Sequence, residues 1–401
     1  MTLATSGTIS IGGSTATRSI NLELGRGATA TSSLGEAVLR GLAGVASGAI
    51  SMASFYGASN ALMEYLVVQC YNPDGYLLLD ISNPSSITDH SYVSGGGYVR
   101  TYTGAMDVPN NLYFSGQSTT DKIVSYSVAS NNLTLKSSSV NSAYWDNYQM
   151  VISKPSTRKL FVAGKTYTGY FGLSRLGYTT AGVFLLEAVQ PYGGPNAPNG
   201  MAANASRSLI FVSGFSGSNL YLTLFSNTSG TPQPANLILS QIHTQYGDVN
   251  SIAMHSSEDY LFSMSAAGGS VDSINISNPT NHTTIFLADT LSGMSDYMRA
   301  CAYDEEEDLL ILYGSSKVWV IDTSDPTNMV LRGSVAHLVS SGTHLGGLTL
   351  DPFRSLAFLG GMSTKSLSII DYSSPTNPTA TSVLLTSINA SAGNIVSLTA
   401  Y

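Results

Sequence analysis

A short pattern recurs about every 48 residues along most of the chain, and it constrains the fold more than any other feature. It is an apolar strand that ends in Asp or Asn and is followed by small polar residues and a proline. Clear copies are residues 77–84, 274–280, 318–326 and 367–375. Degenerate copies are centred on Ser127, Ser174 and Leu224. A strand-rich repeat of about 40–50 residues is typical of a β-propeller with one blade per repeat. We therefore predict an all-β, seven-bladed β-propeller.

The first repeat lacks one of the four short strands that the other repeats contain. Its second strand is predicted over residues 62–70, and nothing before it resembles a first strand. The chain ends with residues 393–401, which match the first strands predicted at 250–255 and 347–351. We expect this C-terminal strand to complete blade one and close the ring, because closure removes exposed strand edges.

Charge and hydropathy exclude several classes of function. Charged residues make up only 10% of the chain, the formal net charge is −8, and the 17 Lys and Arg form no cluster, so we expect no nucleic-acid binding. No run of 18 apolar residues is present, so no membrane insertion is expected. The first residues lack a basic start with an apolar run, which predicts no signal peptide. Cys70 and Cys301 fall in different repeats and are predicted to be buried thiols in a reducing cytosol.

Residues 318–322, Val-Trp-Val-Ile-Asp, carry a family resemblance. They resemble the LVIVD-type propeller repeat, which is named for a Leu-Val-Ile-Val-Asp strand. The resemblance is good in repeats one, five, six and seven and poor in repeats two to four. The family is a loose structural class in bacterial and viral proteins without a common chemistry. The resemblance therefore implies the fold and transfers no functional site.

Residues 1–58 do not belong to the repeat, so we divide the chain into an N-terminal module, 1–58, and a propeller, 59–401. A helix is predicted over 33–43, with Ser33 and Glu36 at capping-box spacing. The bracketing segments 6–10 and 47–57 resemble the two ends of a module in virion proteins of tailed bacteriophages. The match covers roughly 50 of the 401 residues and departs from the module at Ala53-Ser54, where a Ser-Asp pair is expected.

This resemblance implies that residues 1–58 form a small α+β attachment module that docks the chain onto a particle. The residues that it points to are Ile50, Met52, Phe55 and Tyr56. The alternative is a small cap that packs on the ring and serves only its stability.

Motifs for catalysis or metal binding are missing. The sequence contains no phosphate-binding loop, no Gly-x-Ser-x-Gly elbow and no His-Glu-x-x-His, and its six histidines are scattered over different repeats. We predict no metal and no cofactor. The acidic run 304–308 lies where the other repeats have a turn between the first and second strands. We expect a solvated turn there, with a calcium site as the weaker alternative.

Aromatic residues follow the fourth strand in most repeats, where the chain crosses to the next blade. The candidate ligand-binding residues are Tyr102, Tyr144, Trp145, Tyr148, Tyr192, Tyr246 and Tyr297. In a propeller these crossing loops emerge on one face, so tyrosines are predicted to ring that face. Such rings suit sugar stacking or a protein interface. The alternative is that they pack the ends of the blades.

These features together favour a non-enzymatic structural protein of a bacteriophage virion, assembled in the host cytoplasm. We expect it to be tail-associated and homo-oligomeric, bound to other virion proteins through residues 1–58, with the propeller adhering to a host-surface glycan or protein. One alternative is a head decoration or head-fibre protein. A second is a glycan-cleaving enzyme that uses Asp107, Asp304 or Asp351, which are predicted to line the channel. A third, a bacterial surface propeller, is disfavoured by the missing signal peptide.

Overall fold

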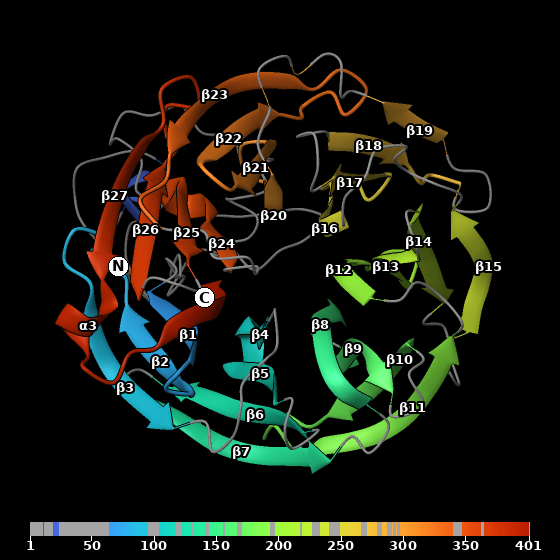
Figure 1. Cartoon of the computed structure of the whole chain (residues 1–401), viewed down its shortest axis with the longest axis horizontal. Helices are drawn as coiled ribbons and strands as arrows, with labels where there is room; N and C mark the ends of the chain where they lie inside the picture. The colour runs from blue at the N-terminus through green and yellow to red at the C-terminus, as the bar shows by residue number, and fades with distance from the viewer. Residues whose placement is uncertain are drawn as a thin grey trace.

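Seven four-stranded antiparallel sheets form a closed ring, a seven-bladed β-propeller (Figure 1). The structure is a computed structural model. It describes residues 11, 19–23, 64–94, 104–117, 122–129, 132–140, 144–154, 157–166, 171–192, 197–216, 219–226, 233–239, 249–265, 271–278, 283–286, 291, 294, 297–339, 347–361 and 365–400. The first strand of each blade lies innermost and the fourth outermost (Figure 1).

The ring begins with the blade that contains the last strand of the chain. From its first to its fourth strand, blade one is β28 (Asn394–Ala400), β1 (Tyr65–Tyr71), β2 (Gly75–Asp80) and β3 (Thr88–Ser94). Blade two is β4 (Ala105–Asp107), β5 (Leu112–Gln117), β6 (Lys122–Ala129) and β7 (Asn132–Val140). Blade three is β8 (Tyr144–Lys154), β9 (Lys159–Thr166), β10 (Phe171–Tyr178) and β11 (Phe184–Tyr192). Blade four is β12 (Ala197–Asn204), β13 (Leu209–Ser216), β14 (Asn219–Ser226) and β15 (Gln233–Leu239).

The remaining blades follow the same order. Blade five is β16 (Val249–Met254), β17 (Tyr260–Ser265), β18 (Val271–Asn275) and β19 (Thr283–Phe286). Blade six is β20 (Met298–Asp304), β21 (Leu309–Gly314), β22 (Lys317–Asp322) and β23 (Val330–Ala336). Blade seven is β24 (Leu348–Asp351), β25 (Leu356–Gly360), β26 (Ser366–Asp371) and β27 (Thr379–Leu384). Short helices are α1 (Ile20–Glu23), η2 (Val108–Asn110), η4 (Pro352–Arg354) and α3 (Leu385–Ile388).

The predicted closure by the C-terminal strand is confirmed. β28 pairs with β1 over a register that runs from Leu66 opposite Ala400 to Tyr71 opposite Asn394. β1 also pairs with β2, so β1 lies between β28, the last strand of the chain, and β2. Blade one is therefore built from both ends of the propeller.

Burial explains why the inner strands are continuous apolar runs. Every residue of β21 and β25 is buried, because neighbouring blades cover both faces of these strands. The outer strands β23 and β27 instead contain only exposed and partly buried residues. The buried apolar residues form seven clusters, and each fills the space between two adjacent blades. The packing between blades therefore provides the core of the ring.

The end of the repeat motif makes the same local turn wherever its carboxylate or amide is present. Asp322 accepts hydrogen bonds from the backbone N–H (2.9 Å) and the hydroxyl (2.7 Å) of Ser324. Asp80, Asn275 and Asp371 make the same pair of bonds with the serine two residues further on. This side-chain turn ends the third strand and explains the spacing of the motif.

The structure corrects the positions of two of the degenerate repeats. We call the position held by Asp80, Asn275, Asp322 and Asp371 in the clear repeats the marker of a repeat. The residue after a marker donates its backbone N–H to the carbonyl just before the second strand, as Thr323 does to Asp308 (2.8 Å) and Tyr178 to Arg158 (3.1 Å). The marker of blade three is therefore Gly177 rather than Ser174. In blade four Ser226 pairs with Leu209 as Asp322 pairs with Leu309, so Ser226 replaces Leu224. The markers are then 80, 127, 177, 226, 275, 322 and 371.

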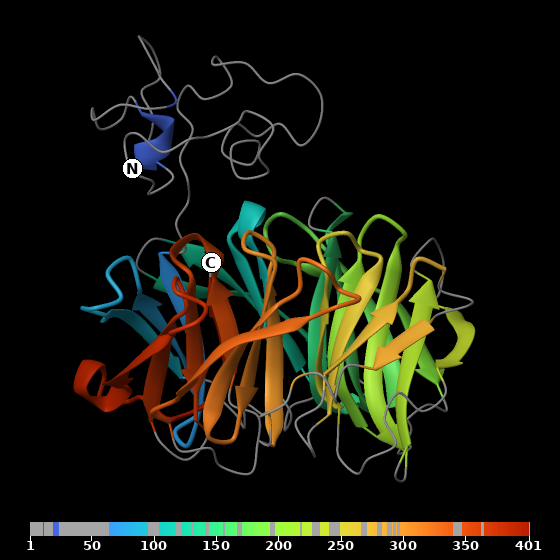
Figure 2. The ribbon, with the colours of Figure 1, turned by 90° about the horizontal axis from the view of Figure 1, so that it is seen from above.

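The chain enters the ring from one defined side. Leu66, near the start of β1, pairs with Ala400 at the end of the first strand β28, so β1 begins on the side where the first strands end. We call this side the turn face; it carries residues 108–111, 205–208, 305–308 and 352–355, which connect first to second strands. We call the opposite side, where the first strands begin, the mouth face. Figure 2 shows the ring edge-on, with α1 on one side of it.

Most of the N-terminal module lies outside the described residues. This includes the helix predicted over 33–43 and the four attachment residues Ile50, Met52, Phe55 and Tyr56. Both cysteines are buried and free, and burial raises the pKa of the Cys70 thiol to about 11 and that of Cys301 to about 12. Within the described part of the chain no helix has the length and apolar character that a bilayer span requires.

Candidate functional site

On the turn face, the last residue of a first strand binds the next blade. The hydroxyl of Tyr178 in blade three donates to the carboxylate of Asp107 in blade two (2.9 Å). The hydroxyl of Tyr372 in blade seven donates in the same way to Asp304 in blade six (2.8 Å). Both tyrosines directly follow the marker of their repeat. We call these contacts between neighbouring blades latches.

The acidic run 304–308 contains one of these latches, the contact between Asp304 and Tyr372. Asp304 exposes no surface and accepts the backbone N–H groups of Glu306 (2.9 Å) and Glu307 (3.3 Å) as well as the Tyr372 hydroxyl. Burial raises the pKa of Asp304, and burial together with the Asp304 charge raises the pKa of Tyr372. Because the first carboxylate holds the turn, the run is not free to surround a cation. No cluster of three ligand-type side chains occurs among the residues that the structure describes.

Two other latches use arginine in place of tyrosine. Arg354 binds the carboxylate of Asp351 in its own turn and donates to the carbonyls of Ile81 and Ser82 (3.0 Å to Ser82) across the junction with blade one. Arg207 makes the corresponding contact with the carbonyl of Ile276 (3.1 Å) across the junction of blades four and five. Both arginines lie three residues after the end of a first strand.

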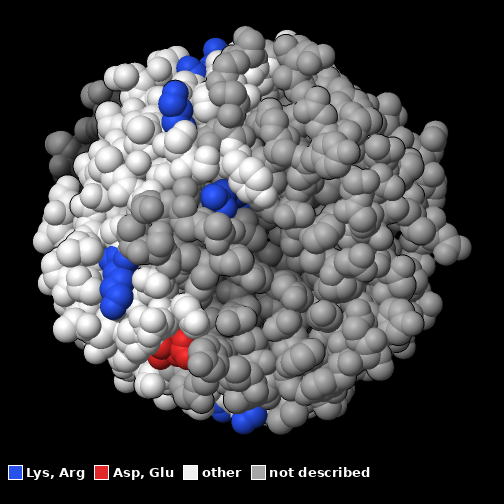
Figure 3. All heavy atoms as spheres, in the orientation of Figure 1, with Lys and Arg blue, Asp and Glu red and all other residues white. Residues whose placement is uncertain are grey.

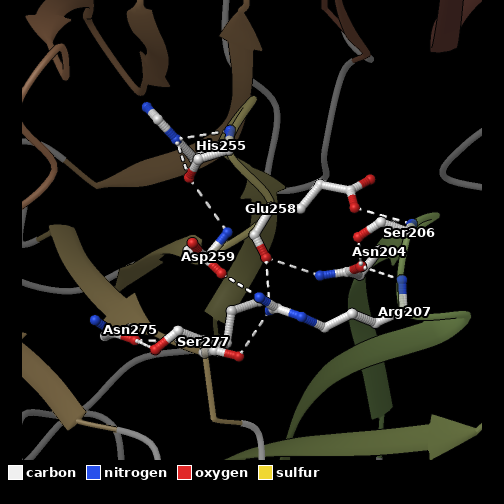
Figure 4. A network of polar contacts seen from close by, with 10 residues as sticks. Asn204, Ser206, Arg207, His255, Glu258, Asp259, Asn275 and Ser277 are labelled. Carbon is white, nitrogen blue, oxygen red and sulfur yellow. Dashed lines mark hydrogen bonds and ion pairs between the residues drawn. The ribbon is translucent and has the colours of Figure 1, made fainter.

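The latch at Arg207 is the centre of a larger polar network (Figure 4). Arg207 also binds the Asp259 carboxylate and the Glu258 carbonyl (3.1 Å), while the Asn204 side-chain amide donates to that same carbonyl (2.8 Å). The Glu258 carboxylate accepts the backbone N–H of Ala205 (3.0 Å) and of Ser206 (2.9 Å). Burial alone would raise the pKa of Glu258, but the bonds from Ser206 and Ala205 outweigh it and lower the pKa.

The expectation that Asp107, Asp304 and Asp351 line the channel is wrong. None of the three side chains exposes surface, and each binds a group at the junction with the next blade. They lie in three separate blades, and each has a partner other than the two remaining carboxylates. A pair of carboxylates flanking a glycosidic bond is therefore not formed by these residues.

The candidate aromatic residues that the structure describes lie at the mouth face, with one correction. Tyr144, Trp145 and Tyr148 belong to the beginning of β8, and Tyr192 ends β11, so these four lie on strands rather than in loops. Tyr297 directly precedes β20, and 42% of its surface is exposed. Tyr102 and Tyr246 lie outside the described residues. The strand register brings the described aromatics to one side of the ring, but along several blades.

A β-bulge recurs at the mouth end of the first strands. The register shifts between Met298 and Ala300 in β20, so the bulged residue is Arg299. Shifts at the matching place leave Tyr148 bulged in β8, Asn199 in β12, Asn250 in β16 and Val396 in β28. An extra residue of this kind re-aims a side chain at the end of a ladder. Sequence patterns did not indicate these bulges, although Tyr148 was selected as an aromatic candidate.

Charge on the ring is sparse. Figure 3 looks along the ring axis and shows the described Lys and Arg side chains singly rather than in a cluster. The guanidinium carbon of Arg299 lies 5.2 Å from the centre of the Tyr297 ring, which is within the range of a cation–π contact. A basic surface for nucleic acid does not occur among the described residues on the face shown.

Comparison with known families finds the repeat itself. The model of the LVIVD repeat matches residues 72–93, which include β2, and residues 315–337, which include β22 and β23. The chain therefore carries LVIVD repeats in blades one and six. A search of the curated proteins finds no match.

Solved structures with the same architecture are numerous but distant in sequence. A functionally unknown protein from Desulfotomaculum acetoxidans has a TM-score of 0.67 at 12% identity, covering 84% of this chain and 98% of its own. A putative 6-phosphogluconolactonase from Bacteroides fragilis has a TM-score of 0.65 at 9% identity, with 86% and 99% coverage. The periplasmic gluconolactonase of Pseudomonas aeruginosa also scores 0.65, at 11% identity with 84% and 98% coverage. Such identities show a shared fold and no shared activity.

Proposed function

We propose that this protein is a structural component of a tailed-bacteriophage virion that is tail-associated and displays its propeller for adhesion to the host surface. The proposal rests on the resemblance of segments 6–10 and 47–57 to a virion module. One structural observation carries it further. The chain joins the ring at the turn face, while the aromatic and bulged positions lie at the mouth face. A ring anchored through residues 1–58 thus presents the opposite face outward.

We further propose that the ring has no catalytic role. Each of the three carboxylates that could have served an enzyme binds a latch residue through one oxygen. Two of the similar structures are described as gluconolactonases, so a lactonase assay with gluconolactone and 6-phosphogluconolactone, alongside host polysaccharide, is the direct control. Turnover that disappears in a single carboxylate variant would replace the adhesion proposal with an enzymatic one.

The attachment experiment uses particles that lack this protein. Full-length protein and a chain that starts at Ala58 are added separately, and bound protein is imaged on the particle. We expect only the full-length chain to bind, at the tail. Binding of both chains, or of neither, contradicts the role of residues 1–58, and labelling of the capsid would favour the head decoration or head-fibre alternative.

A further inference from the structure

We propose that His255 makes the turn of blade five a pH-sensitive latch, which protonation of the imidazole ring loosens in mild acid. The first observation is positional. In four other blades the residue opposite the start of the second strand is a carboxylate or an amide: Asp107, Asn204, Asp304 and Asp351. In blade five this place belongs to His255, whose backbone N–H donates to the carbonyl of Tyr260 (3.0 Å). A group that titrates near neutral pH thus stands where the other blades have Asp or Asn.

The hydrogen bonds of this turn require a neutral imidazole ring. The backbone N–H of Ser257 donates to His255 Nδ1 (3.1 Å), as the N–H of Glu306 donates to Asp304 (2.9 Å). Because a backbone N–H can only donate, Nδ1 must be the acceptor, and the neutral ring carries its hydrogen on Nε2. In acid the added proton goes to Nδ1, and the Ser257 hydroxyl, 2.8 Å away, can accept it. The Ser257 N–H would then face a hydrogen, so the turn must open at this bond.

The surroundings of the ring oppose a positive charge. His255 is buried, and its ring centre lies 5.2 Å from that of Tyr303 in blade six. Burial lowers the pKa of His255, and the charges of Asp308 and Asp259 oppose this without reversing it. The folded protein therefore favours the neutral ring near pH 7. The titratable and charged groups that face the ring come from three blades: Asp259 and Tyr260 in blade five, Tyr303 and Asp308 (3.9 Å from Nε2) in blade six, and Arg207 of blade four through Asp259.

The turn that depends on this ring holds both neighbouring blades. The backbone N–H of Glu258 donates to the His255 carbonyl (2.8 Å), so the place of Glu258 follows the turn. The carboxylate and carbonyl of Glu258 accept four hydrogen bonds from residues 204–207 of blade four (Figure 4). On the other side, the Ser256 hydroxyl shares a hydrogen bond with the Tyr303 hydroxyl of blade six (3.1 Å). Opening of the turn therefore loosens the junctions with blades four and six together.

The direction of the pH effect follows from the folded and unfolded states. Because the folded-state pKa of His255 lies below its unfolded value, the contribution of the neutral ring is complete above the unfolded pKa of about 6.5. It is lost as the pH falls through the folded-state pKa. Most carboxylates are protonated only near pH 4. The interval from about pH 7.5 to about pH 5.5 therefore separates histidine from carboxylate titration.

The test is hydrogen exchange of the purified full-length protein over this interval, followed by mass spectrometry and corrected for the intrinsic exchange rate at each pH. In peptides that contain residues 205–208 and 255–260, we expect protection to fall by about tenfold, the factor for one lost hydrogen bond. Peptides of blade two should keep their protection. His255→Asn should abolish the acid-induced fall, because asparagine holds the turn of blade four, where the Asn204 side chain accepts the backbone N–H of Arg207 (2.9 Å).

His90→Asn is the matched control. His90 lies on β3, the outermost strand of blade one, and its Nε2 is 3.3 Å from the Asp80 carboxylate. This variant makes the same substitution away from blade five, so it should retain the acid-induced fall of the wild type. Solution NMR of the wild type needs no variant to fold: the ring signal of His255, identified by its contacts with the rings of Phe262 and Tyr303, should titrate below pH 6.5.

Three results overturn the proposal. The first is unchanged or increased protection of residues 205–208 and 255–260 in the wild type at pH 5.5. The second is an equal fall in His255→Asn and the wild type. The third is a His255 ring that becomes protonated at or above the ordinary pKa of histidine. None of these measurements involves a particle or a host surface, so the outcome is independent of the proposed function.

Discussion

The two faces of the ring use their polar groups in opposite ways. On the turn face, the buried carboxylate of Asp304 binds Tyr372 of the next blade, and that of Asp351 binds Arg354 of its own turn, although one oxygen of Asp351 has no partner among the described residues. On the mouth face, Arg299 keeps a buried donor without an acceptor among the described residues. The comparison teaches that polar residues near a propeller channel need not be functional. What separates the two roles is whether the partner is already inside the protein.

The largest expected effect breaks the ring itself. Deleting residues 394–401 removes β28, which leaves the edge of β1 unpaired and uncovers the apolar cluster shared by blades seven and one. We expect insoluble or unfolded protein, measured as recovery after size-exclusion chromatography. A soluble monomer with unchanged melting would show that β28 does not close the ring.

Arg354→Ala is expected to be the most damaging single substitution on the turn face. It leaves the fully buried carboxylate of Asp351 without its cation, for which a loss of about 3–5 kcal/mol in the free energy of unfolding is typical. Arg207→Ala is the matched control, since its partner Asp259 is 40% exposed and can be hydrated. Urea denaturation of both should rank Arg354→Ala as the greater loss, and the reverse order would contradict the importance of burial.

The same variant should show a distinct pH dependence. Burial raises the folded-state pKa of Asp351 above its unfolded value, while Arg354 opposes this rise. The ionised carboxylate therefore costs stability above the folded pKa, and this cost is gone below the unfolded pKa. We expect the deficit of Arg354→Ala to shrink as the pH falls through the folded pKa of Asp351. A deficit that is constant from pH 7 to about pH 4 would show that the lost interaction is not ionic.

Tyr372→Phe and Tyr178→Phe test the latches that lack an arginine. Each removes one buried hydroxyl from a carboxylate, which we expect to cost about 1–3 kcal/mol. Asp304 retains two backbone donors, whereas Asp107 retains only the side-chain amide of Asn110 (2.8 Å), and its other oxygen has no partner among the described residues. The loss should therefore be greater for Tyr178→Phe, and chemical denaturation of the two variants side by side gives the answer.

Asp322→Asn should have a small effect that depends on pH. Hydrogen bonds from Ser324 and the charge of Arg332 outweigh burial and lower the pKa of Asp322. Its contribution is present above the unfolded pKa and is lost as the pH falls through the folded pKa. Since the Arg332 side chain is 45% exposed, we expect less than about 1 kcal/mol at pH 7. Melting curves of wild type and variant should converge in acid.

The smallest effect on stability is expected on the mouth face. Arg299→Met removes a guanidinium that makes no hydrogen bond or ion pair within the described residues, so the free energy of unfolding should change by no more than about 0.5 kcal/mol. The comparison of the faces predicts unchanged stability here and lost stability at Arg354. A large destabilisation by Arg299→Met would remove the distinction between them.

The repeat pattern predicted the ring because its turn chemistry is local. Asp80, Asn275, Asp322 and Asp371 bind a serine two residues away, so sequence spacing and structure coincide. Where the carboxylate is missing, only backbone pairing identifies the equivalent position. The sequence pattern therefore pointed to Ser174 and Leu224 instead of Gly177 and Ser226. Copies without the side-chain turn therefore give the number of blades but not their register.

The latches and the bulges were harder to predict from the sequence, because they depend on contacts between segments that are far apart in the chain. Asp304 was noticed as part of an acidic run, but its partner Tyr372 belongs to the next blade. The Asn-x-x-Arg and Asp-x-x-Arg spacings of 204–207 and 351–354 were an available signal for the arginine latches. The bulge at Arg299 leaves no pattern in the sequence, since it is defined only by the register with β21.

Closure by β28 also decides how the ring would bear a load. The chain before Glu64 leads directly into β1, and β1 is held on both sides, by β28 and by β2. Hydrogen bonds in antiparallel ladders are perpendicular to the strands. A pull on a tether at residue 64, opposed by a grip on the mouth face, acts along β1 and shears both ladders together instead of peeling them bond by bond. The strand that takes the force is thus the one that the last residues of the chain clamp in place.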